Sequence, residues 1–229
     1  MINLPTDPFA GRREGKNTFF FHKGILMMRR LFLVTFIAEM VLFAVLSSIN
    51  YHSELLAQSL STERSNIVSG NILSMILIIF PHNLLIATVE FVPIIGPLLF
   101  SISTVVTSLT VASEAFFLYH TSGFVIFSSL VVLPHTWLEL PSYAIAVSAS
   151  IYLIYLVSRR ELLVPYGHKV VYMYLFVVLE LAIAATFESA EIALQSRGLL
   201  VLLTWIAAVP VIYLLILLFR KMNEDEYEK

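Results

Sequence analysis

The sequence predicts an all-α membrane protein, a polytopic bundle of about six transmembrane helices. Apolar residues make up 59% of the 229 residues and charged residues only 13%, whereas soluble domains carry about 25% charged residues. The apolar residues lie in runs of about 20, the length that a helix needs to cross the hydrocarbon core of a bilayer. The alternating ten-residue segments that build a β-barrel are not found. These observations exclude a water-soluble monomer.

Six apolar runs define the expected spans, and polar or turn-forming segments separate them. We place the spans at 31–48, 70–91, 98–117, 138–157, 170–187 and 199–219. Polar loops are expected at 50–69, 158–169 and 188–198. Proline and glycine predict helix breaks near Pro81-His82 and over Pro134–Pro141, and a turn over Val92–Pro97. Residues 123–133 precede the fourth span as a re-entrant or an interfacial segment.

The distribution of basic residues predicts the orientation of the chain. With six crossings and an inside N-terminus, all but two of the 14 Lys and Arg residues fall in segments on the inner side. An excess of Lys and Arg marks the cytoplasmic side, so both termini are expected in the cytosol and the protein in the cell membrane. The domains are then a basic cytosolic tail (1–30), a membrane domain (31–219) and an acidic cytosolic tail (220–229).

Carboxylates inside the spans are the most informative feature of the chain. No Lys or Arg lies within the six predicted spans. Glu39 lies in the first span and Glu180 in the middle of the fifth, and further glutamates lie at or near the ends of other spans: Glu90, Glu114, Glu139 and Glu188. An ionised carboxylate at that depth costs several kcal/mol unless it is paired or hydrated. Each is therefore protonated, hydrogen-bonded, in a wet cavity or bound to a cation.

His135 and Glu139 are the first candidates for a site. They lie four residues apart, so a helix would place them on one face. At a helix break, backbone carbonyls lose their partners, and the two side chains with these carbonyls would form a cation or proton site. In the other interpretation, His135 caps the broken helix and hydrogen-bonds to Glu139, which fixes the bend.

The remaining candidates allow the same two interpretations. His82 and Asn83 lie at the expected kink of the second span, where they would hydrogen-bond across helices or line an ion path. Glu39 and Glu180 lie mid-span beside small residues, which favours close helix approach. A protonated glutamate there would either hydrogen-bond to a neighbouring helix or take part in proton transfer.

Two stretches between Asn83 and Ala149 carry a family resemblance. The first is Asn83 with an apolar helix, the turn at Gly96 and a small-residue helix over Ser101–Ala115. The second is Pro134-His135 with Glu139-Leu140-Pro141 and the small residues that follow, Ala144, Ala146, Ser148 and Ala149. Over roughly residues 70–200, this pattern resembles the stage II sporulation protein M family of multi-pass membrane proteins. The resemblance implies a non-enzymatic protein; in spore-formers, the namesake is associated with peptidoglycan-remodelling partners.

Two function classes follow from these observations. The first is a structural or accessory membrane subunit that acts through partner proteins, and the second is a channel or transporter for cations or protons. Enzyme motifs and cysteine are absent from the sequence, so we expect no enzymatic activity and no cofactor. The expected partners are the lipid bilayer and either further copies of the chain or other membrane proteins, with no nucleic acid.

Overall fold

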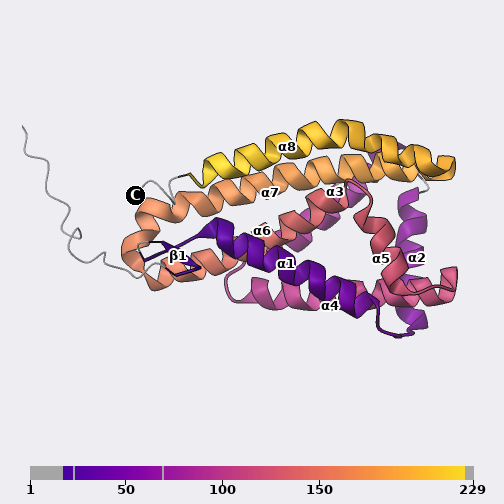
Figure 1. Ribbon diagram of the computed structural model, residues 1–229, viewed down its shortest axis with the longest axis horizontal. Coiled ribbons are helices and arrows are strands. Elements are labelled where there is room, and N and C mark those ends of the chain that lie inside the picture. The colour runs from indigo at the N-terminus through magenta and orange to yellow at the C-terminus, as the bar shows by residue number, and fades with distance from the viewer. Residues whose placement is uncertain (1–17, 23, 69, 225–229) are drawn as a thin grey trace, which may run out of the picture.

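The computed structural model describes residues 18–22, 24–68 and 70–224 of the chain (Figure 1). Most of the expected basic N-terminal tail and the end of the acidic C-terminal tail lie outside these residues. The structure is almost entirely helical. Its elements are β1 (Phe21–His22), β2 (Ile25–Leu26), α1 (Met28–Ser47), α2 (Glu54–Val68), α3 (Ile72–Glu90), α4 (Ile95–Tyr119), α5 (Gly123–Val131), α6 (Thr136–Ser158), α7 (Arg160–Leu194), the 3-10 helix η2 (Gln195–Leu203) and α8 (Thr204–Met222).

Five helical stretches in the described residues are long and apolar enough to cross a membrane. They are Met28–Ser47, Ile72–Glu90, Ile95–Tyr119, Thr136–Ser158 and Arg160–Met222. The last of them contains α7, η2 and α8. The backbone leaves helical geometry at Gly198, with φ +61°, and α8 lies back along α7 (Figure 1). Six crossings and cytosolic termini remain predictions.

Helix α6 lies at the centre of the bundle. It contacts α1, α3, α4 and α7, and Figure 1 shows it between the α7–α8 pair and the α1–α4 pair. Residues 144–150 of α6 are all buried, and most of them are Ala or Ser. Small side chains let helix backbones approach closely, which is how helices associate in a membrane without a hydrophobic driving force between them.

Helix α2 replaces the polar loop that the sequence predicts at 50–69. The side chain of Ser53 accepts a hydrogen bond from the Leu56 amide at 3.4 Å and caps the helix start. The Ser53 amide in turn donates to the Ser113 hydroxyl on α4 at 3.1 Å. Ala57 is buried. The loop prediction is therefore wrong because this polar segment is capped and packs as a helix on α4.

The loops predicted at 158–169 and 188–198 are also largely helical. Helix α7 begins at Arg160, continues through Pro165 and ends at Leu194. Tyr166 and Lys169 are buried near its start, and Ser189 near its end. These polar residues are held against the bundle, so their polarity does not mark a loop.

The two proline-rich segments behave differently from each other. Helix α3 continues through Pro81, so the break predicted near Pro81-His82 is not found there. Between α5 and α6, the chain leaves the helix only over residues 132–135, and α6 continues through Pro141. A proline removes one backbone donor from a helix, and packing by neighbouring helices is sufficient to keep these helices intact.

Candidate functional site

At the break between α5 and α6, side chains donate to carbonyl groups at the end of α5, where the i+4 backbone bonds of a helix stop. The Thr136 hydroxyl donates to the carbonyl of Leu130, and the Trp137 indole donates to that of Val131, both at 2.8 Å. The indole of Trp205, on α8, donates to the Val132 carbonyl at 2.8 Å. The break was expected to offer free carbonyls to a cation. These three carbonyls are already occupied, and the Trp205 bond ties α8 to the segment that follows α5.

His135 follows this break and is paired with Glu191 of α7 rather than with Glu139. The Nδ1 atom of His135 lies in hydrogen-bond contact with Oε2 of Glu191, and the His135 amide donates to Oε1 at 3.4 Å. Both residues are buried. Sequence reasoning missed Glu191 as the partner of His135, because it treated residues 188–198 as a polar loop. The pair fixes the start of α6 against the end of α7.

Glu139 lies one helical turn after His135 and is half-buried. The hydroxyl of Tyr143, on the same helix, donates to its Oε1 at 3.0 Å. The charge of Glu139 also interacts with those of Glu39 and Glu188. Glu139 therefore interacts electrostatically with acidic residues of both α1 and α7.

Glu39 and Glu90 approach this point from α1 and α3. Their exposed fractions are 4% and 1%, and the charge of Glu39 interacts with those of Glu90 and Glu139. The Ser103 hydroxyl donates to Oε1 of Glu90 at 3.1 Å. The Oε2 atoms of Glu39 and Glu90 are buried and have no hydrogen-bond partner. We refer to Glu39, Glu90 and Glu139 as the glutamate cluster.

The geometry of this region does not fit a metal centre. Among the residues that the structure describes, no group of three or more His, Cys, Asp or Glu side chains is arranged to hold a metal ion. Metal sites in proteins need several ligands at fixed short distances. The glutamate cluster brings acidic groups together without that arrangement.

Glu180 lies apart from the glutamate cluster. It is buried on α7, and the Ser142 hydroxyl of α6 donates to its Oε2 at 3.0 Å. Ser142 also donates to the Leu138 carbonyl at 2.7 Å. This is the interhelical hydrogen bond that the sequence allowed for, and it links α6 to α7 at the centre of the bundle.

His82 and Asn83 do not share one environment. Asn83 is buried in the face of α3 that packs on the bundle, whereas His82 is exposed. The two were grouped as one candidate because they follow Pro81, but α3 stays helical there and turns the two side chains to different sides.

An ion pair connects α2 to α4. The Arg64 guanidinium donates to Oε1 of Glu114 and to the Tyr119 hydroxyl, at 3.0 and 2.9 Å. Glu114 is buried, and the Arg64 side chain is 42% exposed. The sequence offered no cation for Glu114, because Arg64 was assigned to a loop.

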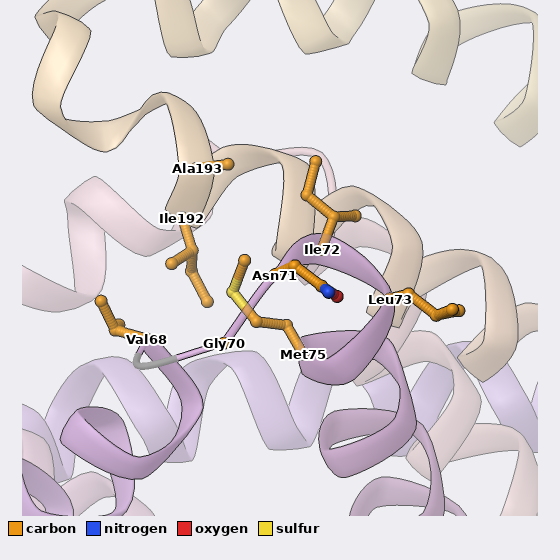
Figure 2. Close-up of a pocket in the computed structure, with 8 residues that line it drawn as sticks. All are labelled: Val68, Gly70, Asn71, Ile72, Leu73, Met75, Ile192 and Ala193. Atoms are coloured by element: carbon orange, nitrogen blue, oxygen red, sulfur yellow. The ribbon is translucent and has the colours of Figure 1, made fainter.

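Two shallow apolar grooves lie outside the glutamate cluster. One, of about 600 Å³, lies between the α2–α3 connection and the end of α7. Figure 2 shows Val68, Met75 and Ile192 pointing toward it and Leu73 pointing away. The Asn71 side chain beside it accepts from the Ser74 amide at 2.9 Å and caps α3. The other groove follows one face of α1, along Val34, Ile37, Ala38, Val41, Leu42 and Val45.

The apolar helices and the carboxylates buried between them define a multi-helix membrane protein. A family model described as Stage II sporulation protein M matches residues 30–190, more than half of the chain. The chain belongs to the stage II sporulation protein M family. The match confirms the resemblance drawn from the sequence and also includes α1. No curated protein and no solved structure matches the chain.

Proposed function

We propose that this chain is a non-enzymatic membrane subunit that acts structurally, through partner proteins. The observation that carries the proposal is that many of its buried polar groups already have hydrogen-bond partners within the chain. Glu180 is bonded to Ser142, His135 to Glu191, and the carbonyls at the α5–α6 break to side chains. Polar groups that serve the packing of the chain itself leave little for an ion path or a catalytic centre.

A second observation supports action through partners. Helix α1 exposes a continuous apolar face, on which Ile37, Val41 and Val45 are each more than half exposed. An apolar face of this kind fits lipid or an apolar helix of another membrane protein. We propose that the partner is a further copy of the chain or another integral membrane protein.

The membrane topology is part of this proposal. Helices α7 and α8 lie side by side and are joined through the turn at Gly198, which supports two separate crossings in Arg160–Met222. Arg29, Arg30, Arg159, Arg160, Arg220 and Lys221 flank the helices at the ends predicted to be inside. We therefore propose six crossings of the cell membrane with both termini in the cytosol.

Photo-crosslinking in native membranes tests the proposal. A photoreactive residue at Val41, exposed on α1, is expected to give a discrete protein adduct that mass spectrometry can identify. The matched control is Phe43 on the same helix, which is 7% exposed and is expected to give adducts only within the chain. The absence of a protein adduct at all three exposed positions, Val41, Ile37 and Val45, would contradict action through this face.

The competing hypothesis is a channel or transporter for cations or protons. It requires a wet path that connects Glu139 and Glu180, whereas Glu180 is buried and bonded to Ser142. The packing therefore favours the structural role. The ion-flux measurement that separates the two hypotheses is described at the end of the Discussion.

A further inference from the structure

The glutamate cluster has no structural explanation comparable to that of Glu180 or His135. Its members come from α1, α3 and α6, and two of them place a buried carboxylate oxygen where no donor reaches it. We propose that Glu39, Glu90 and Glu139 form a proton-binding site that exchanges its proton with water through Glu188. This inference concerns a bound ligand and is independent of the partner role.

The first step is the energetic cost of the cluster without a ligand. Glu39 interacts electrostatically with both Glu90 and Glu139, and no basic side chain is among these interactions. Carboxylates that share one site cannot all be ionised, and a buried charge without a partner is unfavourable in a membrane. A polar atom buried without a hydrogen-bond partner is itself destabilising. The cluster therefore needs a positive ligand.

The second step is the identity of that ligand. The described side chains offer no three-ligand metal arrangement. A proton needs only one oxygen to hold it and a second to accept the hydrogen bond. A proton on Glu39 would turn this side chain from a pure acceptor into a donor toward Glu90 or Glu139. It would thus remove one charge and satisfy one of the two unpartnered oxygens.

The third step is the route by which a proton arrives. Glu188, on α7, is half-buried, and its charge interacts with those of Glu139, His135, Glu191 and Arg64. Tyr143 interacts with Glu139, Glu90 and Glu188, and its hydroxyl donates to Glu139. A series of titratable groups thus extends from the half-buried Glu188 through Glu139 and Tyr143 to the buried Glu90. On α4, Ser103 faces Glu90, while Glu114 is paired with Arg64.

The transfer balances as a series of single proton movements. A hydronium ion from the solution protonates the Glu188 carboxylate and is left as water. Glu188 passes that proton to the Glu139 carboxylate and returns to its ionised form, and Glu139 passes it to Glu39 or Glu90. The net result is one proton taken up from hydronium and one negative charge fewer in the cluster. Because Glu90 is only 1% exposed, the series ends inside the bundle. The site is loaded from one side and does not conduct.

Infrared spectroscopy of the purified full-length protein in lipid vesicles tests this site. The carbonyl stretch of protonated carboxyl groups is recorded while the pH is changed in steps, with protons as the only ligand added. Wild type is expected to show a pH-dependent band that falls to half or less in Glu39→Gln and in Glu90→Gln. Glu161→Gln, an exposed position in the first turn of α7, is the matched control and should leave the band unchanged.

The entrance is tested by the rate of response to a pH jump. Glu188→Gln is expected to slow the change of the band about tenfold or more, because a positioned acid–base group contributes at least that much to proton transfer. An unchanged rate in this variant would contradict the entry of protons through Glu188. An unchanged band in both Glu39→Gln and Glu90→Gln would overturn the site. If Glu39→Gln does not fold, Glu39→Asp replaces it, and if Glu90→Gln does not fold, Glu90→Asp replaces it. Each aspartate variant is expected to shift the band rather than remove it.

These outcomes separate the site from the proposed function. If the band falls in Glu39→Gln and Glu90→Gln and the Val41 position gives a protein adduct, both inferences are supported. If the adduct forms but the band is unchanged in both variants, only the proton site is overturned. If the band falls in both variants but no adduct forms, only the partner role is overturned.

Discussion

Alanine in place of Gly96 is expected to destabilise the folded bundle by about 3 kcal/mol or more, because backbone occupies the space that a side chain would need. A Cβ atom at this position would lie 1.8 Å from the carbonyl oxygen of Glu90 and 2.6 Å from its carbonyl carbon. The turn cannot relax easily. Ile94, inside it, already has φ +71°, and the Ser150 hydroxyl holds the Val92 carbonyl at 3.0 Å.

Thermal unfolding in detergent measures this effect, with Gly167→Ala as the matched control. The nearest atom to a Cβ at position 167 is a flexible one, Cδ1 of Leu163, at 3.9 Å. Alanine is also about 1 kcal/mol better than glycine inside a helix, so Gly167→Ala should be neutral or stabilising. Equal melting temperatures for the two variants would contradict the tight packing of α3 against α4.

Replacing Glu191 with leucine is expected to cost about 3–5 kcal/mol, the usual effect of removing one member of a buried ion pair. His135 would lose both contacts to that carboxylate, at its ring nitrogen and at its amide. The substitution leaves the imidazole buried beside Thr136 and Leu138, which are themselves buried. It also releases the start of α6 from the end of α7.

A double-mutant cycle provides the control for this prediction. His135→Leu combined with Glu191→Leu removes both polar partners and leaves neither unpaired, so the double variant should be more stable than Glu191→Leu alone. Unfolding by denaturant gives the four free energies of unfolding that the cycle requires, those of wild type, His135→Leu, Glu191→Leu and the double variant. Additive effects of the two substitutions would show that the residues are not coupled, which would contradict the pairing.

Much of the fold could be predicted from the sequence, because the periodic and compositional signals lie in the spans themselves. Run length located α1, α3, α4 and α8 within a few residues. The central position of α6 was not predicted, although the small residues after Pro141 belong to the pattern that carries the family resemblance and allow the close approach of its neighbours. The His135 and Glu139-Leu140-Pro141 motif led to the family that the comparison confirms.

The errors share one physical cause, which is that polarity alone does not reveal a tertiary partner. Segment 50–69 became α2 because Ser53 caps it and Arg64 reaches Glu114 on α4. Residues 188–194 of the segment 188–198 belong to helix α7 because Glu191 hydrogen-bonds to His135. In both cases the partner lies about 50 residues or more away. No local pattern contains that information.

The candidate site was predicted in part for the same reason. Spacing along α6 grouped His135 with Glu139, whereas the structure pairs His135 with Glu191 of α7. Glu139 accepts a hydrogen bond from Tyr143 and interacts electrostatically with Glu39 of α1. Glu90 read as a span end, yet it is among the most buried carboxylates. The sequence singles out the carboxylates in and near the spans, but only the packing of the helices shows which groups lie beside each of them.

Ion flux into liposomes that contain only this protein tests the central claim most directly, namely that the chain forms a packed bundle with no conducting path along its buried glutamates. Wild type, Glu139→Gln and Glu180→Gln are compared for protons and for monovalent and divalent cations under an imposed membrane potential. The packed bundle predicts flux no greater than that of empty liposomes for all three proteins. Flux through wild type that either substitution abolishes, with folding intact, would contradict this account and identify a channel.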